Sequence, residues 1–111
     1  MTSTLSLEQL RDDGIIHASW ASALAPVQPQ LDDLADFLER EAQSGVQVLP
    51  EPHNIMRAFR MPVDAVRVLI VGQDPYPTPG YAIGLSFAVE EHVRPLPRSL
   101  SNIFAELERD T

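Results

Sequence analysis

Apolar positions recur with a helical period in the first half of the chain. Between residues 30 and 44 they fall at offsets 0, 3, 4, 7 and 11, which is one face of a helix with about 3.6 residues per turn. Pro29 before this stretch and Gly45 after it are residues that commonly flank helices. The spacing therefore predicts a helix over residues 30–44, with an apolar face formed by Leu31, Leu34, Ala35, Leu38 and Ala42.

Shorter stretches show similar spacing. Helical turns are expected over Ser6–Leu10, around Trp20 and over residues 53–60. A last helix follows Ser99, a residue type that often caps a helix N-terminus. Its apolar face lies at offsets 0, 3, 4 and 7, at Leu100, Ile103, Phe104 and Leu107.

The segment Val66–Val71 has a different pattern, because its apolar residues are nearly continuous. It is rich in β-branched residues and ends at Gly72. A short apolar run that ends at a turn signal predicts a strand buried on both faces, as in a parallel sheet. A second, shorter strand is expected at Leu85–Val89, after a loop over residues 72–84 that is rich in proline and glycine.

These strands are too few for a complete parallel sheet, both faces of which must be covered. The last helix also runs to the end of the sequence without a Gly or Pro stop. We therefore expect an α/β fold in which residues 1–111 form a single partial domain, the N-terminal half of a larger unit.

Composition narrows the functional classes. The 111 residues include 16 acidic and 8 basic ones, and a net charge of −8 is too acidic for a basic nucleic-acid arm or a membrane-surface peptide. The absence of Cys excludes disulfides, thiolate metal sites and a thiol nucleophile. No apolar run approaches the roughly 18 residues of a membrane span, and no signal peptide is recognisable. We expect a cytoplasmic protein without membrane contacts.

Candidate chemistry follows the first predicted strand directly. Ligands of open α/β sheets bind beyond the carboxyl ends of the strands. There the sequence places an amide at Gln73, a carboxylate at Asp74 and an aromatic ring at Tyr76. From these residues alone, a plain turn in which Asp74 caps the next helix is the favoured interpretation, since Asp-Pro is a common turn dipeptide, and Phe87 in the second strand would be a core residue.

Three stretches together resemble the family 1 uracil-DNA glycosylases. Gly72–Tyr76 is similar to their water-activating loop and Gly84–Val89 to their uracil-stacking strand. Arg94–Leu100, running into Asn102–Phe104 and Glu106-Leu107, is similar to their proline-rich loop and the helix after it. The resemblance covers roughly residues 12–111. It implies a three-layer α/β/α fold with a central parallel twisted sheet, of which this chain holds the N-terminal half.

The resemblance also implies an activity, which is hydrolysis of the N-glycosidic bond of deoxyuridine in DNA, the first step of base excision repair. The expected partner is uracil-containing DNA, single- or double-stranded, and a monomer with no cofactor and no metal is expected. Asp74 would be the catalytic carboxylate. The residues implied to bind uracil are Gln73, Tyr76 and Phe87, and those implied to contact DNA are Pro97 and Ser99.

Within the implied site, Tyr76 would press against C5 of the base, where thymine carries a methyl group, and Phe87 would stack on the flipped base. The sequence also departs from the family. Pro77 stands where the family usually has His, and Leu96 and Arg98 interrupt the prolines before Ser99.

The family's Asn-bearing strand and His-Pro-Ser loop have no counterpart among these residues. His17, His53 and His92 lie at other places in the order and are expected to be ordinary surface or partly buried side chains. We therefore expect this chain alone to be inactive. One alternative is a non-catalytic remnant or interaction module that retains the motif. Another is a generic nucleotide-binding α/β protein, for which the isolated Gly72 is a poor phosphate loop.

Overall fold

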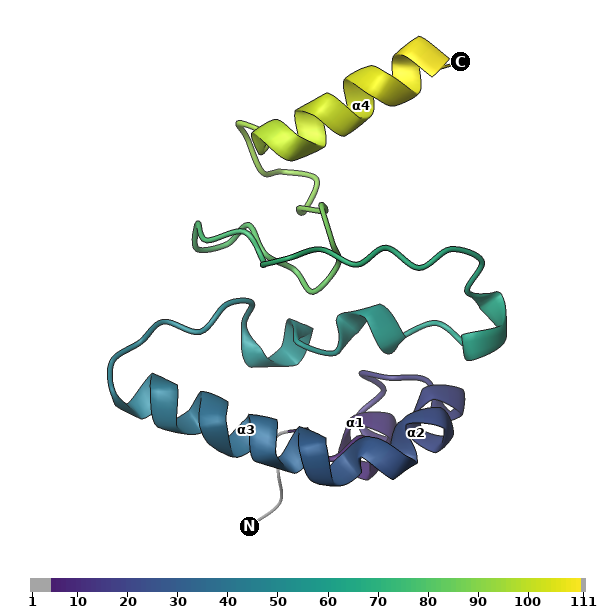
Figure 1. The fold of residues 1–111 in the computed structure, drawn as a ribbon, viewed down its shortest axis with the longest axis vertical. Helices are drawn as coiled ribbons and strands as arrows, with labels where there is room; N and C mark the ends of the chain where they lie inside the picture. The colour runs from purple at the N-terminus through teal and green to yellow at the C-terminus, as the bar shows by residue number, and fades with distance from the viewer. Residues whose placement is uncertain (1–4, 111) are drawn as a thin grey trace.

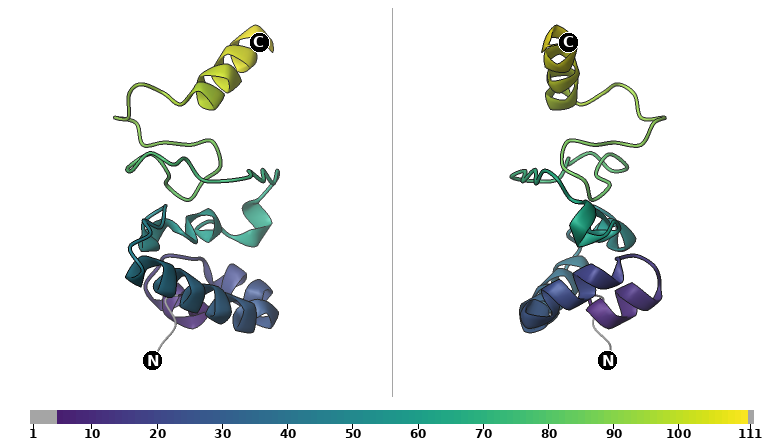
Figure 2. Two further views of the ribbon diagram at one scale, coloured as in Figure 1. Left: turned by 60° about the vertical axis from the view of Figure 1, so that its left-hand side comes forward. Right: turned by 90° about the vertical axis from the view of Figure 1, so that its right-hand side faces the viewer.

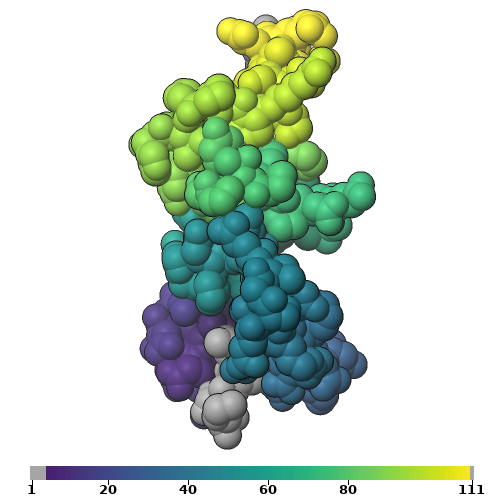
Figure 3. All heavy atoms as spheres, turned by 90° about the vertical axis from the view of Figure 1, so that its left-hand side faces the viewer, coloured from purple at the N-terminus to yellow at the C-terminus, as the bar shows by residue number. Residues whose placement is uncertain are grey.

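Helices gather at the two ends of an elongated molecule, and turns and extended segments lie between them (Figure 1). The computed structural model describes residues 5–110, and its principal extents are 49 × 38 × 22 Å. Helices α1 (Leu7–Asp12), α2 (Ala18–Leu24) and α3 (Gln28–Gln43) lie at one end, and α4 (Arg98–Asp110) lies at the other. Figure 3 shows the same order along the surface of the molecule.

The three N-terminal helices confirm the helical patterns in this part of the sequence. The Ser6 hydroxyl caps α1 by accepting a hydrogen bond from the Gln9 N–H at 3.3 Å. The His17 ring caps α2 by accepting from the Ser19 N–H at 3.1 Å. After α3, Gly45 adopts a φ of +94°, a conformation that glycine enters without steric cost.

The main hydrophobic core lies between these helices and the segment after them. Met56 is the buried core residue of the segment after α3, and the other buried members of the core lie within residues 5–35. The Gln28 side chain accepts a hydrogen bond from the Leu7 N–H at 2.8 Å and donates one to the Leu5 carbonyl at 3.0 Å, so it ties α3 to the start of the chain. The buried members of the core are Leu5, Leu7, Leu10, Ile16, Ala21, Ala35 and Met56.

The predicted helix over residues 53–60 is replaced by two single-turn 3-10 helices, Pro52–Asn54 and Arg57–Phe59. Their backbone hydrogen bonds span three residues rather than four. Trp20 of α2 holds this segment in place, because its indole N–H donates to the Met61 carbonyl at 2.7 Å and its ring meets that of Phe59 edge to face at 4.8 Å.

The predicted strands are not formed within residues 5–110. Val66–Val71 is drawn out across the middle of the molecule, but residues 67–71 make no backbone hydrogen bond in the described part of the chain (Figure 1). Leu69 and Val71 are 81% and 80% exposed. Leu85–Val89 also forms no strand.

The physical reason is the absence of neighbours. A strand of a parallel sheet is held by backbone hydrogen bonds at its edges and by packing on both faces. Residues 5–110 supply no second strand for Val66–Val71, so the expected three-layer α/β/α arrangement with a central parallel sheet is not seen in the structure.

Helix α4 stands away from the N-terminal helices, as two further views show (Figure 2). It begins at Arg98, so Ser99 lies in its first turn instead of capping it as predicted. The apolar face is present, but only Leu100 is buried, and Phe104 and Leu107 are 50% and 58% exposed. Among residues 5–110, no helix has the length and apolar character needed to cross a membrane.

Candidate active site

One pocket of about 710 Å³ gathers five of the six residues expected at the site. It lies among the loop after Val71, the turn that contains Phe87 and the start of α4. Apolar side chains including Pro50, Ile55 and Ile83 complete its wall. Pro97 is half-buried just before α4 and does not line it. The expected residues that do are Gln73, Asp74, Tyr76, Phe87 and Ser99.

The two motif segments meet at Gly72. A Cβ atom at this position would lie 3.3 Å from the Ser86 hydroxyl oxygen, closer than most such contacts. The glycine therefore allows the backbone of the Asp74 loop to approach the segment that carries Phe87. This approach explains how residues 13 positions apart come to line one pocket.

Two residues that line the pocket are joined by a contact between their hydroxyl groups. The Tyr76 Oη and the Ser99 Oγ lie 3.2 Å apart, within hydrogen-bond distance, and both residues are partly buried. The contact joins the loop after Val71 to the first turn of α4.

Phe87 has an unusual backbone conformation. It lies in a turn closed by a hydrogen bond from the Ala88 N–H to the Leu85 carbonyl at 3.2 Å, and its φ is +61°. Bulky residues rarely occupy this region, and such strained conformations persist where the surroundings hold them, often at functional sites. Phe87 remains 38% exposed, so one part of the residue is available to a ligand.

Two contacts hold the Phe87 turn against the 3-10 segment. Gly84, with a φ of +85°, lies so close to Asn54 that a Cβ atom would overlap the Asn54 carbonyl oxygen. On the other side of Phe87, the Glu90 carboxylate pairs with the Arg57 guanidinium at 3.0 Å. Arg57, Asn54 and Glu90 are not predicted by the sequence, because no local pattern indicates a contact between residues 30 or more positions apart.

Asp74 is exposed at the pocket, and its carboxylate makes no hydrogen bond or ion pair within residues 5–110. An ionised carboxylate offers only acceptor sites. Its oxygens are therefore free to accept hydrogen bonds from a water molecule or to face a developing positive charge. Gln73 is likewise exposed at the pocket and offers both an amide donor and an acceptor.

None of the three histidines lines this pocket. His17 caps α2, His53 is exposed in the 3-10 helix Pro52–Asn54, and His92 is exposed in a turn before α4. In the described part of the chain, no three His, Asp or Glu side chains gather as metal ligands would.

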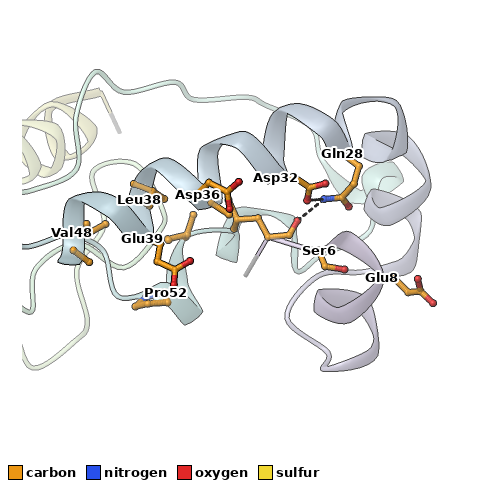
Figure 4. A pocket seen from close by; sticks show the side chains of 13 residues that line it. Ser6, Glu8, Gln28, Asp32, Asp36, Leu38, Glu39, Val48 and Pro52 are labelled. Atoms are coloured by element: carbon orange, nitrogen blue, oxygen red, sulfur yellow. Dashed lines mark hydrogen bonds between the residues drawn. The ribbon is translucent and has the colours of Figure 1, made fainter. Parts of the chain in front are cut away.

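A second pocket, of about 780 Å³, lies between α1 and α3 and shares Ile55 with the first pocket (Figure 4). Acidic side chains including Glu8, Asp32, Asp36 and Glu39 surround apolar ones there. None of the residues expected at the site lines it.

Comparison with known sequences identifies relatives of this chain. Proteins named Uracil-DNA glycosylase from Mycolicibacterium vanbaalenii and from Tropheryma whipplei are each 57% identical to it over 104 residues, which is 94% of this chain and 44% or 45% of those proteins. The protein of the same name from Mycolicibacterium smegmatis is 57% identical over 96 residues, 86% of this chain and 42% of that protein.

No family model matches the chain. The chain spans less than half the length of the curated relatives that it matches. Identity of 57% over nearly all of the chain nevertheless confirms the resemblance that the three motifs indicated: the chain is similar to part of the length of proteins named Uracil-DNA glycosylase.

Proposed function

We propose that this chain supplies the water-activating and base-selecting part of a uracil-DNA glycosylase. The observation that carries the proposal is the pocket in which Asp74, Tyr76 and Phe87 meet Ser99, in a chain closely similar to proteins of that name. In the proposed reaction, the oxygen of water bonds to C1′ of deoxyuridine while the bond from C1′ to N1 breaks and its electron pair leaves with uracil. The proton that the water loses neutralises the uracil anion.

Asp74 has the catalytic role in this proposal. As the glycosidic bond breaks, positive charge develops on the sugar, and a fixed carboxylate stabilises that charge. The same carboxylate accepts a hydrogen bond from the attacking water and orients its oxygen toward C1′. The exposed, unpaired carboxylate of Asp74 at the pocket suits both tasks.

Three residues would select the base. Phe87 would stack on the flipped uracil, as enzymes that extrude a base commonly hold it between apolar or aromatic groups. Tyr76 would occupy the space beside C5 and exclude the methyl group of thymine by steric overlap. Gln73 would offer polar contacts to the edge of the base.

Pro97 and Ser99 would contact DNA on the side of the pocket nearest α4. Ser99 lies in the first turn of a 13-residue helix, where backbone N–H groups and the helix dipole favour an anion such as a phosphate. The net charge of −8 opposes strong binding, since phosphate contacts by basic residues dominate affinity for DNA. We therefore propose that the 111 residues alone bind DNA weakly.

The complete activity requires more than these residues in our proposal. The part of the relatives' sequence that this chain does not span would provide partners for Val66–Val71. This segment would then become a strand of the central parallel sheet in a three-layer α/β/α fold. It would also provide the group that stabilises the departing uracil anion. The glycosylase would act as a cytoplasmic monomer, on uracil in single- or double-stranded DNA.

The test compares two proteins. One is the 111-residue chain. The other joins residues 1–111 to the part of the Mycolicibacterium vanbaalenii relative that this chain does not match, and we call it the extended chain. Both are incubated with single- and double-stranded oligonucleotides that carry one uracil, and released uracil is measured. We expect release by the extended chain only. Release by neither protein would instead support a non-catalytic module that retains the motif.

A further inference from the structure

We propose that Ser99 is a positioning residue for Tyr76, through which it sets the width of the pocket beside C5 of the base. The inference rests on the proposed function and extends it, because Ser99 was expected only to contact a DNA phosphate. The observation behind it is the 3.2 Å distance between the Tyr76 and Ser99 hydroxyl oxygens.

The need for such a residue follows from the size of the pocket. Its volume of about 710 Å³ is far larger than a single pyrimidine base. A methyl group is therefore excluded only if the Tyr76 ring stays in one place. Pro75 restricts the backbone before the ring, since its own φ is fixed near −65°, but it does not restrict the far end of the side chain. In the described residues, the only hydrogen-bond partner of the Tyr76 hydroxyl is the Ser99 hydroxyl.

The chemistry of a serine hydroxyl allows both roles at once. It has one proton to donate and two lone pairs that accept. If Ser99 donates its proton to a DNA phosphate, its oxygen is left to accept the proton of the Tyr76 hydroxyl. Hydrogen bonds linked in this way polarise and strengthen one another. Binding of the DNA backbone thus fixes the ring that tests the base.

The test measures selectivity at C5 in the extended chain. The substrates are single-stranded oligonucleotides that carry uracil or 5-fluorouracil, since fluorine is larger than hydrogen and smaller than a methyl group. The quantity compared among variants is kcat/KM for uracil divided by kcat/KM for 5-fluorouracil. The electronic effect of fluorine is common to all variants, so a change in this ratio reports the fit at C5.

Ser99→Ala and Tyr76→Phe each remove one partner of the contact. We expect each to lower the ratio by a similar factor, from about twofold to about tenfold, which corresponds to the usual net worth of one hydrogen bond. The double variant is expected to lower it no further than either single change, because both remove the same interaction. Ser99→Thr keeps the hydroxyl and should keep the ratio of the parent.

Tyr81→Phe is the matched control. The Tyr81 hydroxyl donates to the Pro95 carbonyl at 3.2 Å, so this change also removes a tyrosine hydrogen bond, in this case to the segment just before α4. Tyr81 does not line the pocket. Its ratio should equal that of the parent.

The outcomes separate this inference from the proposed function. If the parent releases uracil and Ser99→Ala slows both substrates equally, Ser99 acts on the phosphate alone and the positioning role is wrong. Additive effects in the double variant would overturn it as well. If the parent extended chain releases no uracil, the proposed function fails, and the positioning role fails with it.

Discussion

The hydroxyl oxygens of Tyr76 and Ser99 lie 3.2 Å apart, although 23 positions separate the two residues in the sequence. The contact connects the loop that follows the extended segment to the first turn of α4. It makes neighbours of the ring that would select the base and the side chain that would contact a phosphate. In the proposed function, the residues that recognise the base and those that contact the DNA backbone are therefore adjacent.

Replacing Tyr76 by Ala in the extended chain should allow slow release of thymine. The change removes the ring that would overlap the 5-methyl group, in a turn whose backbone Pro75 restricts. Discrimination by overlap is lost when the overlapping group is removed. The measurement is thymine release from a duplex that contains an A·T pair.

Tyr81→Ala serves as the control for this change, since it removes a tyrosine from outside the pocket. Its thymine release should stay at the background level. Intact uracil release by Tyr76→Ala without detectable thymine release would place the methyl filter at another residue.

The helices could be predicted from the sequence because their determinants are local. The 30–44 pattern, with Pro29 near its start and Gly45 after it, corresponds to α3, displaced by two residues at most. Hydrogen bonds within a helix join residues four positions apart, so a short window of sequence contains the information.

The strand at Val66–Val71 shows where local reasoning ends. Its composition is that of a buried strand, but its hydrogen-bond partners must come from elsewhere in a protein. Within residues 5–110 those partners are absent, and the segment is extended and exposed. The composition of the segment therefore indicates that its backbone favours a strand, but not whether a partner strand is present to form one.

The site residues were predicted by their motifs, but their geometry was not. Asp74, Tyr76 and Phe87 do line one pocket, whereas the positive φ of Phe87 and the contact between Tyr76 and Ser99 depend on tertiary packing. No periodicity or motif encodes such contacts, and the same holds for the approach of Gly84 to Asn54.

That approach yields a prediction for stability. Gly84→Ala in the extended chain should destabilise the fold more than Gly80→Ala, although both glycines have a φ near +85°. The left-handed conformation alone costs an L-residue roughly 1–2 kcal/mol. At Gly84 the added methyl group also overlaps the Asn54 carbonyl, while at Gly80 nothing lies within 4 Å.

Urea denaturation of both variants measures this difference. Gly80→Ala should show the conformational cost alone, and Gly84→Ala should show a clearly lower midpoint together with weaker uracil release, because the Phe87 turn is displaced. Equal midpoints for the two variants would mean that the close approach to Asn54 is not maintained in solution.

The exposed extended segment predicts self-association of the 111-residue chain. Apolar, unpaired strand-like segments promote pairing between molecules, and a lysine in such a segment opposes it. Leu69→Lys should therefore increase the monomeric fraction of the 111-residue chain in sedimentation velocity experiments. In the extended chain, where the segment would be a buried strand, the same change should lower the melting temperature.

Val27→Lys is the control, since Val27 is a partly exposed apolar residue of the N-terminal helical part, 39% exposed. It should change the monomeric fraction much less than Leu69→Lys does. A 111-residue chain that is fully monomeric before any substitution would contradict the expectation that this segment promotes association.

The central claim is that Asp74 is the catalytic carboxylate of a uracil-DNA glycosylase, and single-turnover release of uracil tests it most directly. The comparison is between the extended chain, Asp74→Asn and the control Asp64→Asn, which changes an exposed Asp that does not line the pocket. Asparagine keeps the shape of the side chain and removes the charge that a cationic transition state requires. We predict that Asp74→Asn binds uracil-containing DNA as the parent does and releases uracil at least about 100-fold more slowly, while Asp64→Asn matches the parent. Release by Asp74→Asn at the rate of the parent would contradict the account.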